Sequence, residues 1–208
     1  MTRRGWGWSG PLAAVLSAAC LIGFAAARPE YSHATKAVSE LGAVGAPNAT
    51  LFNVYGFMLP GMLVAVLGLV LHRQIQDPKR SALGPALLIV SGLSVAGAGL
   101  LPLDLDNVQG VLSLGHMLMV QASGLSYALA LFVLGARMVK DERWRAFGRI
   151  TPWFVLFLLA NIAWQVAWLN TGAVLPGWGQ RIGFFGYFGW VALAGLMAVR
   201  AEADEPRG

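Results

Sequence analysis

Charged residues are scarce in this chain, and their scarcity decides its class. Of the 208 residues, 12% are Asp, Glu, Lys or Arg, whereas 57% are hydrophobic, and the mean hydropathy is +0.62. A water-soluble domain normally carries about 25% charged residues. The composition therefore excludes an ordinary soluble protein and predicts an all-α, polytopic integral membrane protein.

Cysteine and the motifs of common enzyme chemistry are also missing. Cys20 is the only cysteine, so the chain cannot form an internal disulfide. There is no His-Glu-x-x-His or His-x-x-x-His spacing for zinc, and no Gly-x-Ser-x-Gly nucleophile elbow. We therefore expect no cofactor and no bound metal. If a metal were held, His33, His116 and Asp104 would be the candidate ligands.

Long apolar runs are what the chain does contain. Six stretches lack any charged residue, and each can hold the roughly 20 residues that a spanning helix needs. They are Gly5–Ala27, Leu51–Leu71, Ser81–Leu103, Asn107–Ala136, Ile150–Gln180 and Ile182–Val199. They predict one domain over residues 1–208, with six transmembrane helices at approximately 8–27, 51–72, 82–101, 109–136, 151–170 and 181–200.

The cations are distributed unevenly between the segments that join these runs. With a cytoplasmic amino terminus, only Arg28, Lys36 and Arg181 of the 15 Lys and Arg residues lie outside, in agreement with the positive-inside rule. The basic pI of 9.9 thus reports orientation, and no nucleic-acid partner is expected. We predict a multi-pass protein of the cell inner (plasma) membrane, with both termini cytoplasmic and an uncleaved first helix.

The first outer loop has an amphipathic pattern. Between Tyr31 and Leu41, apolar residues share one helical face and polar residues share the other. The apolar set is Tyr31, Ala34, Val38 and Leu41, and the polar set is His33, Lys36 and Glu40. We expect a short amphipathic helix on the outer membrane surface.

Three spans carry residues that predict how they pack. Pro60 removes a backbone donor from the second span and should kink it. The third span contains small residues, among them Gly92, which let helix backbones approach closely. Asn161 and Gln165 in the fifth span should face the bundle interior, because lipid offers no hydrogen bonds.

The stretch from Pro102 to Tyr127 is the best candidate for a functional interior. Asp104 and Asp106 precede an apolar helix on which polar residues recur near one stripe. These are Gln109, Ser113, His116, Ser123 and Tyr127. His116 could be a general base, a metal ligand or an interhelical hydrogen-bonding residue, and the last is the preferred interpretation.

Several short motifs resemble those of one bacterial family of membrane proteins. They are Val38–Ala43, Pro47–Ala49, Leu51–Asn53 leading into Gly56–Gly61, Pro102–Asp104 followed by Gly115–His116, and Gln180–Arg181. Together they are similar to the family called domain of unknown function 998. The resemblance implies six helices and a membrane location, and it implies no particular activity.

Residues near the outer ends of the helices form the predicted ligand-binding site. The candidates are Glu40, Asn53, Asp104, Asp106, His116 and Arg181. Arg181 is the only cation at the outer end of the last two spans, and a buried guanidinium needs an anionic partner. That partner is either one of the three carboxylates, which is the preferred interpretation, or the phosphate or carboxylate of a ligand.

Three functions are consistent with such a site. The first is the binding of a lipid head group or small amphiphile without covalent chemistry. The alternative is an intramembrane lipid hydrolase or transferase, with His116 as base and Asp104 or Glu40 beside it, acting with or without a metal; an enzyme is the less favoured class. A small-solute transporter is the third hypothesis, and no internal repeat supports it. Membrane lipid, a second copy of the chain or other membrane proteins are the expected partners.

Overall fold

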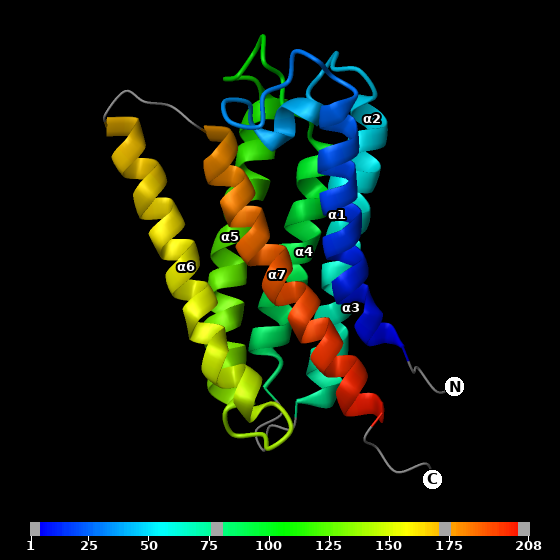
Figure 1. Cartoon of the computed structure of the whole chain (residues 1–208), viewed down its shortest axis with the longest axis vertical. Helices are drawn as coiled ribbons and strands as arrows, with labels where there is room; N and C mark the ends of the chain where they lie inside the picture. Colours follow the sequence, from blue (N-terminus) through cyan, green and yellow to red (C-terminus); the bar gives the residue numbers. More distant parts are fainter. Residues whose placement is uncertain (1–4, 76–80, 171–175, 204–208) are drawn as a thin grey trace.

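The computed structural model describes residues 5–75, 81–170 and 176–203. In these ranges the chain forms helices and no strand. Six segments are long and apolar enough to cross a membrane, which confirms the predicted all-α architecture (Figure 1). In chain order they are η1 (Trp6–Trp8) with α1 (Ser9–Ala26); α2 (Ala49–Phe52) with η3 (Asn53–Met58) and α3 (Leu59–Gln74); α4 (Leu83–Leu100); α5 (Val111–Met138); α6 (Arg145–Asn170); and α7 (Pro176–Ala203).

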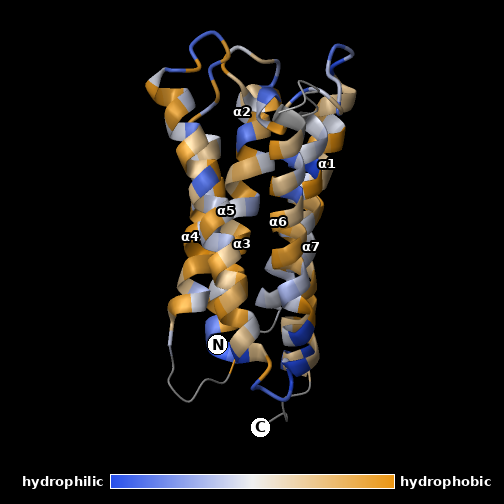
Figure 2. Cartoon of the chain, turned by 90° about the vertical axis from the view of Figure 1, so that its left-hand side faces the viewer, coloured by the Kyte–Doolittle hydropathy of each residue, from blue (hydrophilic) through white to orange (hydrophobic). Residues whose placement is uncertain are grey.

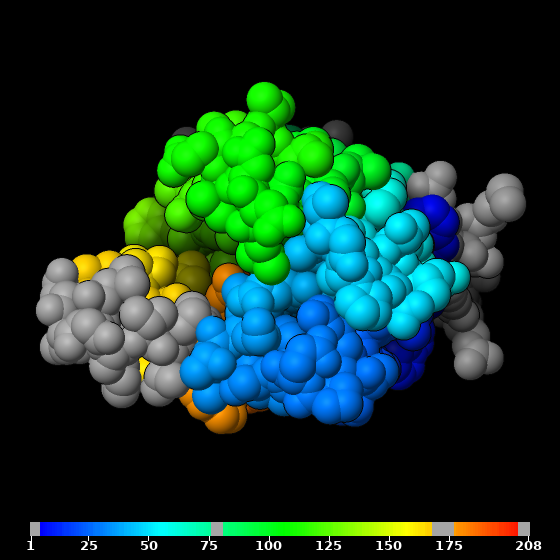
Figure 3. All heavy atoms as spheres, turned by 90° about the horizontal axis from the view of Figure 1, so that it is seen from above, coloured from blue at the N-terminus to red at the C-terminus, as the bar shows by residue number. Residues whose placement is uncertain are grey.

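The spans stand side by side as one bundle (Figure 1). The start of η1 and the end of α7 lie at the same end, called the termini end, where the Gly5 N–H donates to Glu202 Oε2 at 2.9 Å. The opposite end, here called the cap end, carries the cap loop (residues 28–48) and the turn between α4 and α5. Figure 2 shows hydrophilic residues at the two ends of the bundle and mostly hydrophobic residues along the spans. Seen from above in Figure 3, the cap loop and the α4–α5 turn cover much of the cap end. This distribution is the one that a bilayer requires.

The backbones of α3 and α4 pack closely against each other. A Cβ atom added to Gly61 would lie 2.4 Å from the carbonyl oxygen of Gly92, and one added to Gly92 would lie 2.5 Å from the carbonyl oxygen of Gly61. The two backbones are therefore in direct contact, as the small residues of the third predicted span indicated. Leu67 of α3, Leu88 of α4 and Leu131 of α5 are fully buried around this contact.

The sequence predicted a kink at Pro60 in the second span, and the structure shows the form that this disturbance takes. The six residues before α3, Asn53–Met58, form the π-helical segment η3, and Pro60 follows in the first turn of α3. Proline has no N–H for a bond to the fourth residue back, and its ring crowds that carbonyl. A wider turn relieves this crowding, so the expected disturbance is a π-segment.

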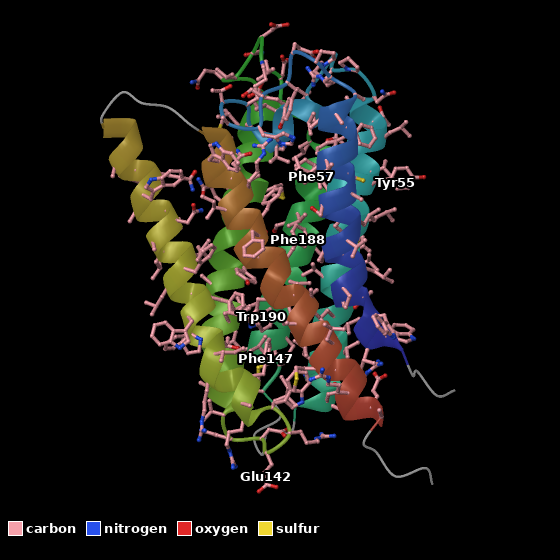
Figure 4. The ribbon with its side chains drawn as sticks, in the orientation of Figure 1. Tyr55, Phe57, Glu142, Phe147, Phe188 and Trp190 are labelled. Carbon is pink, nitrogen blue, oxygen red and sulfur yellow. The ribbon has the colours of Figure 1, made fainter. Side chains whose placement is uncertain are left out.

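Helix α6 lies at the edge of the bundle (Figures 1 and 3). Only 11% of its most apolar 18-residue window is buried, against 56% for the span Ala49–Gln74. The half of α6 farther from the cap end is held by a hydrogen bond to α7. Trp190 Nε1 of α7 donates to Thr151 Oγ1 at 3.1 Å. The centre of the Phe147 ring lies 5.7 Å from that of the Trp190 ring, and Figure 4 labels the two residues close together in the lower half of the bundle.

Toward the cap end, α6 rests on α7 through glycine positions. Side chains of α6 approach three glycines of α7 so closely that an added Cβ would meet them at 2.5 to 3.1 Å. The pairs are Gln165 with Gly179, Asn161 with Gly183, and Phe157 with Gly186. Asn161 is buried and its Nδ2 donates to the Gly179 carbonyl at 3.1 Å, as predicted for an interior amide. Each glycine thus forms a notch for one α6 side chain.

The amphipathic helix expected over Tyr31–Leu41 is much shorter in the structure. Helical geometry covers only the 3-10 segment η2, Val38–Gly42, so the predicted extent was wrong. Ala37 is extended, with a ψ of 150°, which interrupts helical geometry before η2, and side chains also bond to carbonyls of this segment. Arg181 donates to the Lys36 carbonyl at 3.0 Å, and the Tyr31 hydroxyl donates to the Ala37 carbonyl at 2.9 Å.

Candidate functional site at the cap end

Arg181 in the first turns of α7 is the centre of the cap-end hydrogen-bond network. Its Nε donates to His33 Nδ1 at 2.9 Å, and its Nη2 donates to the Tyr31 hydroxyl at 2.6 Å. Its Nη1 donates to the carbonyls of Lys36 at 3.0 Å and Gly177 at 2.8 Å. The guanidinium carbon also lies 5.5 Å from the centre of the Tyr31 ring, within cation–π range. Arg181 therefore ties the cap loop to α7.

None of these partners carries a negative charge. The interpretation in which Asp104, Asp106 or Glu40 pairs with Arg181 is therefore wrong for the described part of the chain. Glu40 instead accepts from the Lys36 ammonium at 3.3 Å. The sequence indicated a carboxylate partner because burying a guanidinium costs free energy, but backbone carbonyls and a hydroxyl supply the hydrogen bonds here.

The other two cations predicted for this end do have acidic partners. Arg28 pairs with Glu30 at 2.7 Å, and Lys36 pairs with Glu40 as described above. The hydrogen bond from Arg28 holds the pKa of Glu30 below its ordinary value. Within the described residues, Arg181 is thus the cap-end cation whose charge is not balanced by a neighbouring carboxylate.

The contacts around Arg181 also set the protonation of its neighbours. Desolvation and the positive charge of Arg181 lower the pKa of His33, which fits an Nδ1 that accepts a hydrogen bond and so must be unprotonated. Burial raises the pKa of Tyr31. At neutral pH the group therefore consists of a neutral histidine, a neutral tyrosine and one cation.

His116 of α5 hydrogen-bonds to the carboxyl-terminal end of α4. Its Nδ1 lies 2.9 Å from the carbonyl oxygens of both Ala98 and Leu101, which belong to the last turn of α4 and its end. These carbonyls have no partner within their own helix. The side chain is only 4% exposed, and the Phe57 ring packs edge-on at 6.1 Å. His116 therefore forms hydrogen bonds between α5 and α4. A general base would normally bond to a carboxylate, whereas the partners of this Nδ1 are backbone carbonyls.

Asp104 and Asp106 belong to the turn between α4 and α5. Asp104 Oδ1 accepts from the backbone N–H of Asp106 at 3.1 Å and of Asn107 at 3.2 Å. The Ser113 hydroxyl bonds to both the backbone N–H and the carbonyl of Asp104, each at 2.9 Å. Asp104 therefore shapes the turn that begins α5, and the Asp106 side chain is exposed.

Glu40 and Asn53 hold the cap loop in place. Glu40 Oε1 accepts from the backbone N–H of Ala37 at 2.8 Å, one half of a capping box at the start of η2. The buried Asn53 donates through Nδ2 to the Gly42 carbonyl at 2.8 Å. A Cβ atom on Gly42 would lie 2.0 Å from Asn53 Oδ1, so only glycine fits there. Figure 4 shows Phe57 of the same span in the region below the cap loop.

The six predicted site residues thus divide into local arrangements. Asp104 and Asp106 belong to one turn, His116 bonds to the end of α4, Glu40 and Asn53 hold the cap loop, and Arg181 joins that loop to α7. Among the residues that the structure describes, no three His, Cys, Asp or Glu side chains could hold a metal ion together.

A second feature was not predicted from the sequence. Aromatic side chains of α6 and α7 line a cleft of about 200 Å³. Its lining consists of Trp153, Phe154, Phe157, Phe185 and Gly186. The signal that could have found it is the spacing of Trp153 and Phe157, four residues apart, which places two aromatic side chains on one face of α6.

Six membrane-crossing helices, closed at one end by a hydrogen-bonded loop, define a multi-pass integral membrane protein. Residues 11–197 match the family described as Protein of unknown function (DUF998). The chain belongs to this family, which confirms the resemblance of its motifs. No curated protein and no solved structure matches the chain.

Proposed function

We propose that the protein binds an anionic lipid head group at its cap end, with Arg181 as the recognising residue. The observation that carries the proposal is a cap-end guanidinium with only neutral partners among the described residues. Such a cation attracts an anion strongly, because a charged hydrogen bond to phosphate is roughly twice as strong as a neutral one.

Two features of Arg181 support this role. A guanidinium has five N–H donors, and its four hydrogen bonds to described residues leave one Nη2 hydrogen for a ligand. The residue also lies near the amino terminus of the 28-residue helix α7, where the helix dipole favours a negative group. Its side chain is half-buried, so solvent screens an approaching anion only in part.

The scaffold residues have a different part in this proposal. Glu40, Asn53, Asp104 and His116 fix the cap loop and the α4 end, and Arg181 makes the contact with the ligand. If the cap end faces outward, as the uneven distribution of cations predicts, the lipid belongs to the outer leaflet. The binding requires no covalent chemistry.

Head-group competition tests the proposal. We would incubate the purified full-length protein with equal amounts of dioleoyl phosphatidylglycerol and dioleoyl phosphatidylcholine, which differ only in the head group, and measure the bound ratio by native mass spectrometry. The wild type should retain more of the anionic lipid. Arg181→Gln should reduce that preference about tenfold, because the free energy of one charged hydrogen bond corresponds to roughly a tenfold change in affinity.

Arg28→Gln is the matched control, because Arg28 lies at the same end but pairs with Glu30. This variant should keep at least half of the wild-type preference. Equal retention of both lipids by the wild type, or equal loss in the two variants, would contradict recognition by Arg181. Thermal unfolding of each variant shows whether the cap loop is still folded.

A further inference from the structure

The cleft between α6 and α7 lies beside the contact of Phe157 with Gly186 and is lined almost entirely by aromatic side chains. Its walls are the rings of Trp153 and Phe157 on one side and Phe185 on the other, and Gly186 forms part of its floor. Trp153 is 68% exposed and Phe185 is 77% exposed, so the cleft opens away from the bundle core, toward the lipid. A Cβ on Gly186 would lie 2.7 Å from the Phe157 ring, so the absence of a side chain there keeps the floor at the level of the backbone.

The depth of the cleft can be measured along α7 from Arg181. Phe185 is four residues further on, about 6 Å deeper at 1.5 Å per residue. Phe157 rests on Gly186, and Trp153 lies about one turn deeper along the antiparallel α6, so the cleft ends about 14 Å below Arg181. One leaflet of the hydrocarbon core is about 15 Å thick. The cleft therefore begins about 6 Å below Arg181 and covers about 8 Å of depth, roughly half of one leaflet.

The size and lining of the cleft indicate one kind of occupant. A helix about 10 Å across would need roughly 600 Å³ over the same 8 Å of depth, three times the volume of the cleft. A single hydrocarbon chain is narrow enough, and an aromatic lining offers it dispersion contacts without any polar group that would be left unpaired. A whole helix, from a second copy of the chain or from a partner protein, is too wide to enter this space and could reach it only with single side chains.

We propose that the α6–α7 cleft binds one acyl chain of the anionic lipid whose head group contacts Arg181. This inference rests on the proposed function for the identity of the head group. The protein would then recognise an entire phospholipid from the side, with the phosphate at the cap end and the chain between two helices. The glycine notches that seat α6 also determine the width of this chain site.

Quenching of Trp153 fluorescence tests the chain site. The probe is phosphatidylglycerol with bromine atoms at the middle of its acyl chains, titrated into the full-length protein in detergent micelles. Bromine quenches tryptophan at close range, and the difference between wild type and Trp153→Phe isolates the signal of Trp153. We expect this signal to saturate as the lipid is added.

Two alanine variants provide the matched comparison. Phe185→Ala removes a cleft wall, whereas Phe132→Ala removes an equally exposed ring of α5, which is 74% exposed and lies outside the cleft. Phe185→Ala should raise the half-saturating lipid concentration about fivefold, because the acyl chain no longer packs against an aromatic wall. Phe132→Ala should change it less than twofold. Trp153 quenching that rises without saturation, or equal effects of the two variants, would overturn the chain site.

The lipid competition assay and the Trp153 titration together separate this inference from the proposed function. If Arg181→Gln leaves the preference for phosphatidylglycerol unchanged while Trp153 quenching saturates, the chain site stands and head-group recognition fails. If Arg181 controls the preference but Trp153 quenching does not saturate, head-group recognition stands and the chain site is overturned.

Discussion

The α3–α4 and α6–α7 interfaces use glycine for different purposes. Gly61 and Gly92 bring two backbones into contact, so an added side chain would meet main-chain atoms. Gly183 and Gly186 instead receive the side chains of Asn161 and Phe157. Backbone atoms of a packed helix cannot move away from an added side chain, whereas a neighbouring side chain can adopt another rotamer. The first interface is therefore rigid, and the second can adjust to a neighbour such as a lipid chain.

The largest effect is expected when the rigid interface is forced apart. Gly92→Leu would place side-chain atoms against the backbone of Gly61 and Ala65, and overpacking of this kind should lower the free energy of unfolding by at least about 3 kcal/mol. Thermal unfolding followed by circular dichroism in detergent measures the loss. Gly124→Leu on α5 is the control, because nothing lies within 4 Å of a Cβ at Gly124. Equal losses in the two variants would contradict backbone contact as the cause.

A smaller effect is expected at the adjustable interface. Gly186→Ala would push against the ring of Phe157, but this side chain is 38% exposed and can rotate toward lipid. The free energy of unfolding should fall by about 1 kcal/mol. The double variant Gly186→Ala with Phe157→Ala should recover part of that loss, since the two side chains no longer collide. Strictly additive losses in the same unfolding assay would show that the two residues do not interact.

The smallest effect is expected for the hydrogen bond between Arg181 of α7 and His33 of the cap loop, whose contribution to stability should depend on pH. Because the pKa of His33 is lowered from 6.5 in the folded protein, the unfolded chain takes up a proton first as the pH falls. The contribution of neutral His33 to stability is complete above pH 6.5 and is lost on acidification below it. The wild type should therefore lose more thermal stability between pH 7.5 and pH 5.5 than His33→Gln, which keeps an acceptor but does not titrate. The difference should be small because His33 is exposed. Parallel pH profiles of the two proteins would argue against this contact.

The sequence predicted the spans well because a bilayer imposes a minimum length of apolar chain. The boundaries of α4, Leu83–Leu100, differ from the predicted 82–101 by one residue. In contrast, α6 begins at Arg145 and α7 at Pro176, several residues before the predicted positions of 151 and 181. Those additional turns contain polar residues or glycine, and hydropathy gives no signal for a helix that extends beyond the membrane.

The partners of the site residues were much harder to predict. Arg181 was recognised as important because it is a lone cation, yet its contacts with Tyr31 and His33 join residues about 150 positions apart, and no local pattern encodes them. The predicted Tyr31–Leu41 helix failed for the same reason. Amphipathic spacing describes a segment in isolation, whereas a side chain from α7 bonds here to one of its carbonyl groups.

The π-helical segment Asn53–Met58 can also be regarded as an insertion in the second span. In an unbroken α-helix, Asn53 and Gly61 would point about 80° apart, because they are eight residues apart. One extra residue rotates the chain by about 100°, which brings both onto the side of α4. There Gly61 meets Gly92, and the Asn53 carbonyl lies against Gly99. This span contains one residue more than a regular helix would use. The extra residue rotates the helix so that its first part contacts the cap loop while Gly61 still faces α4.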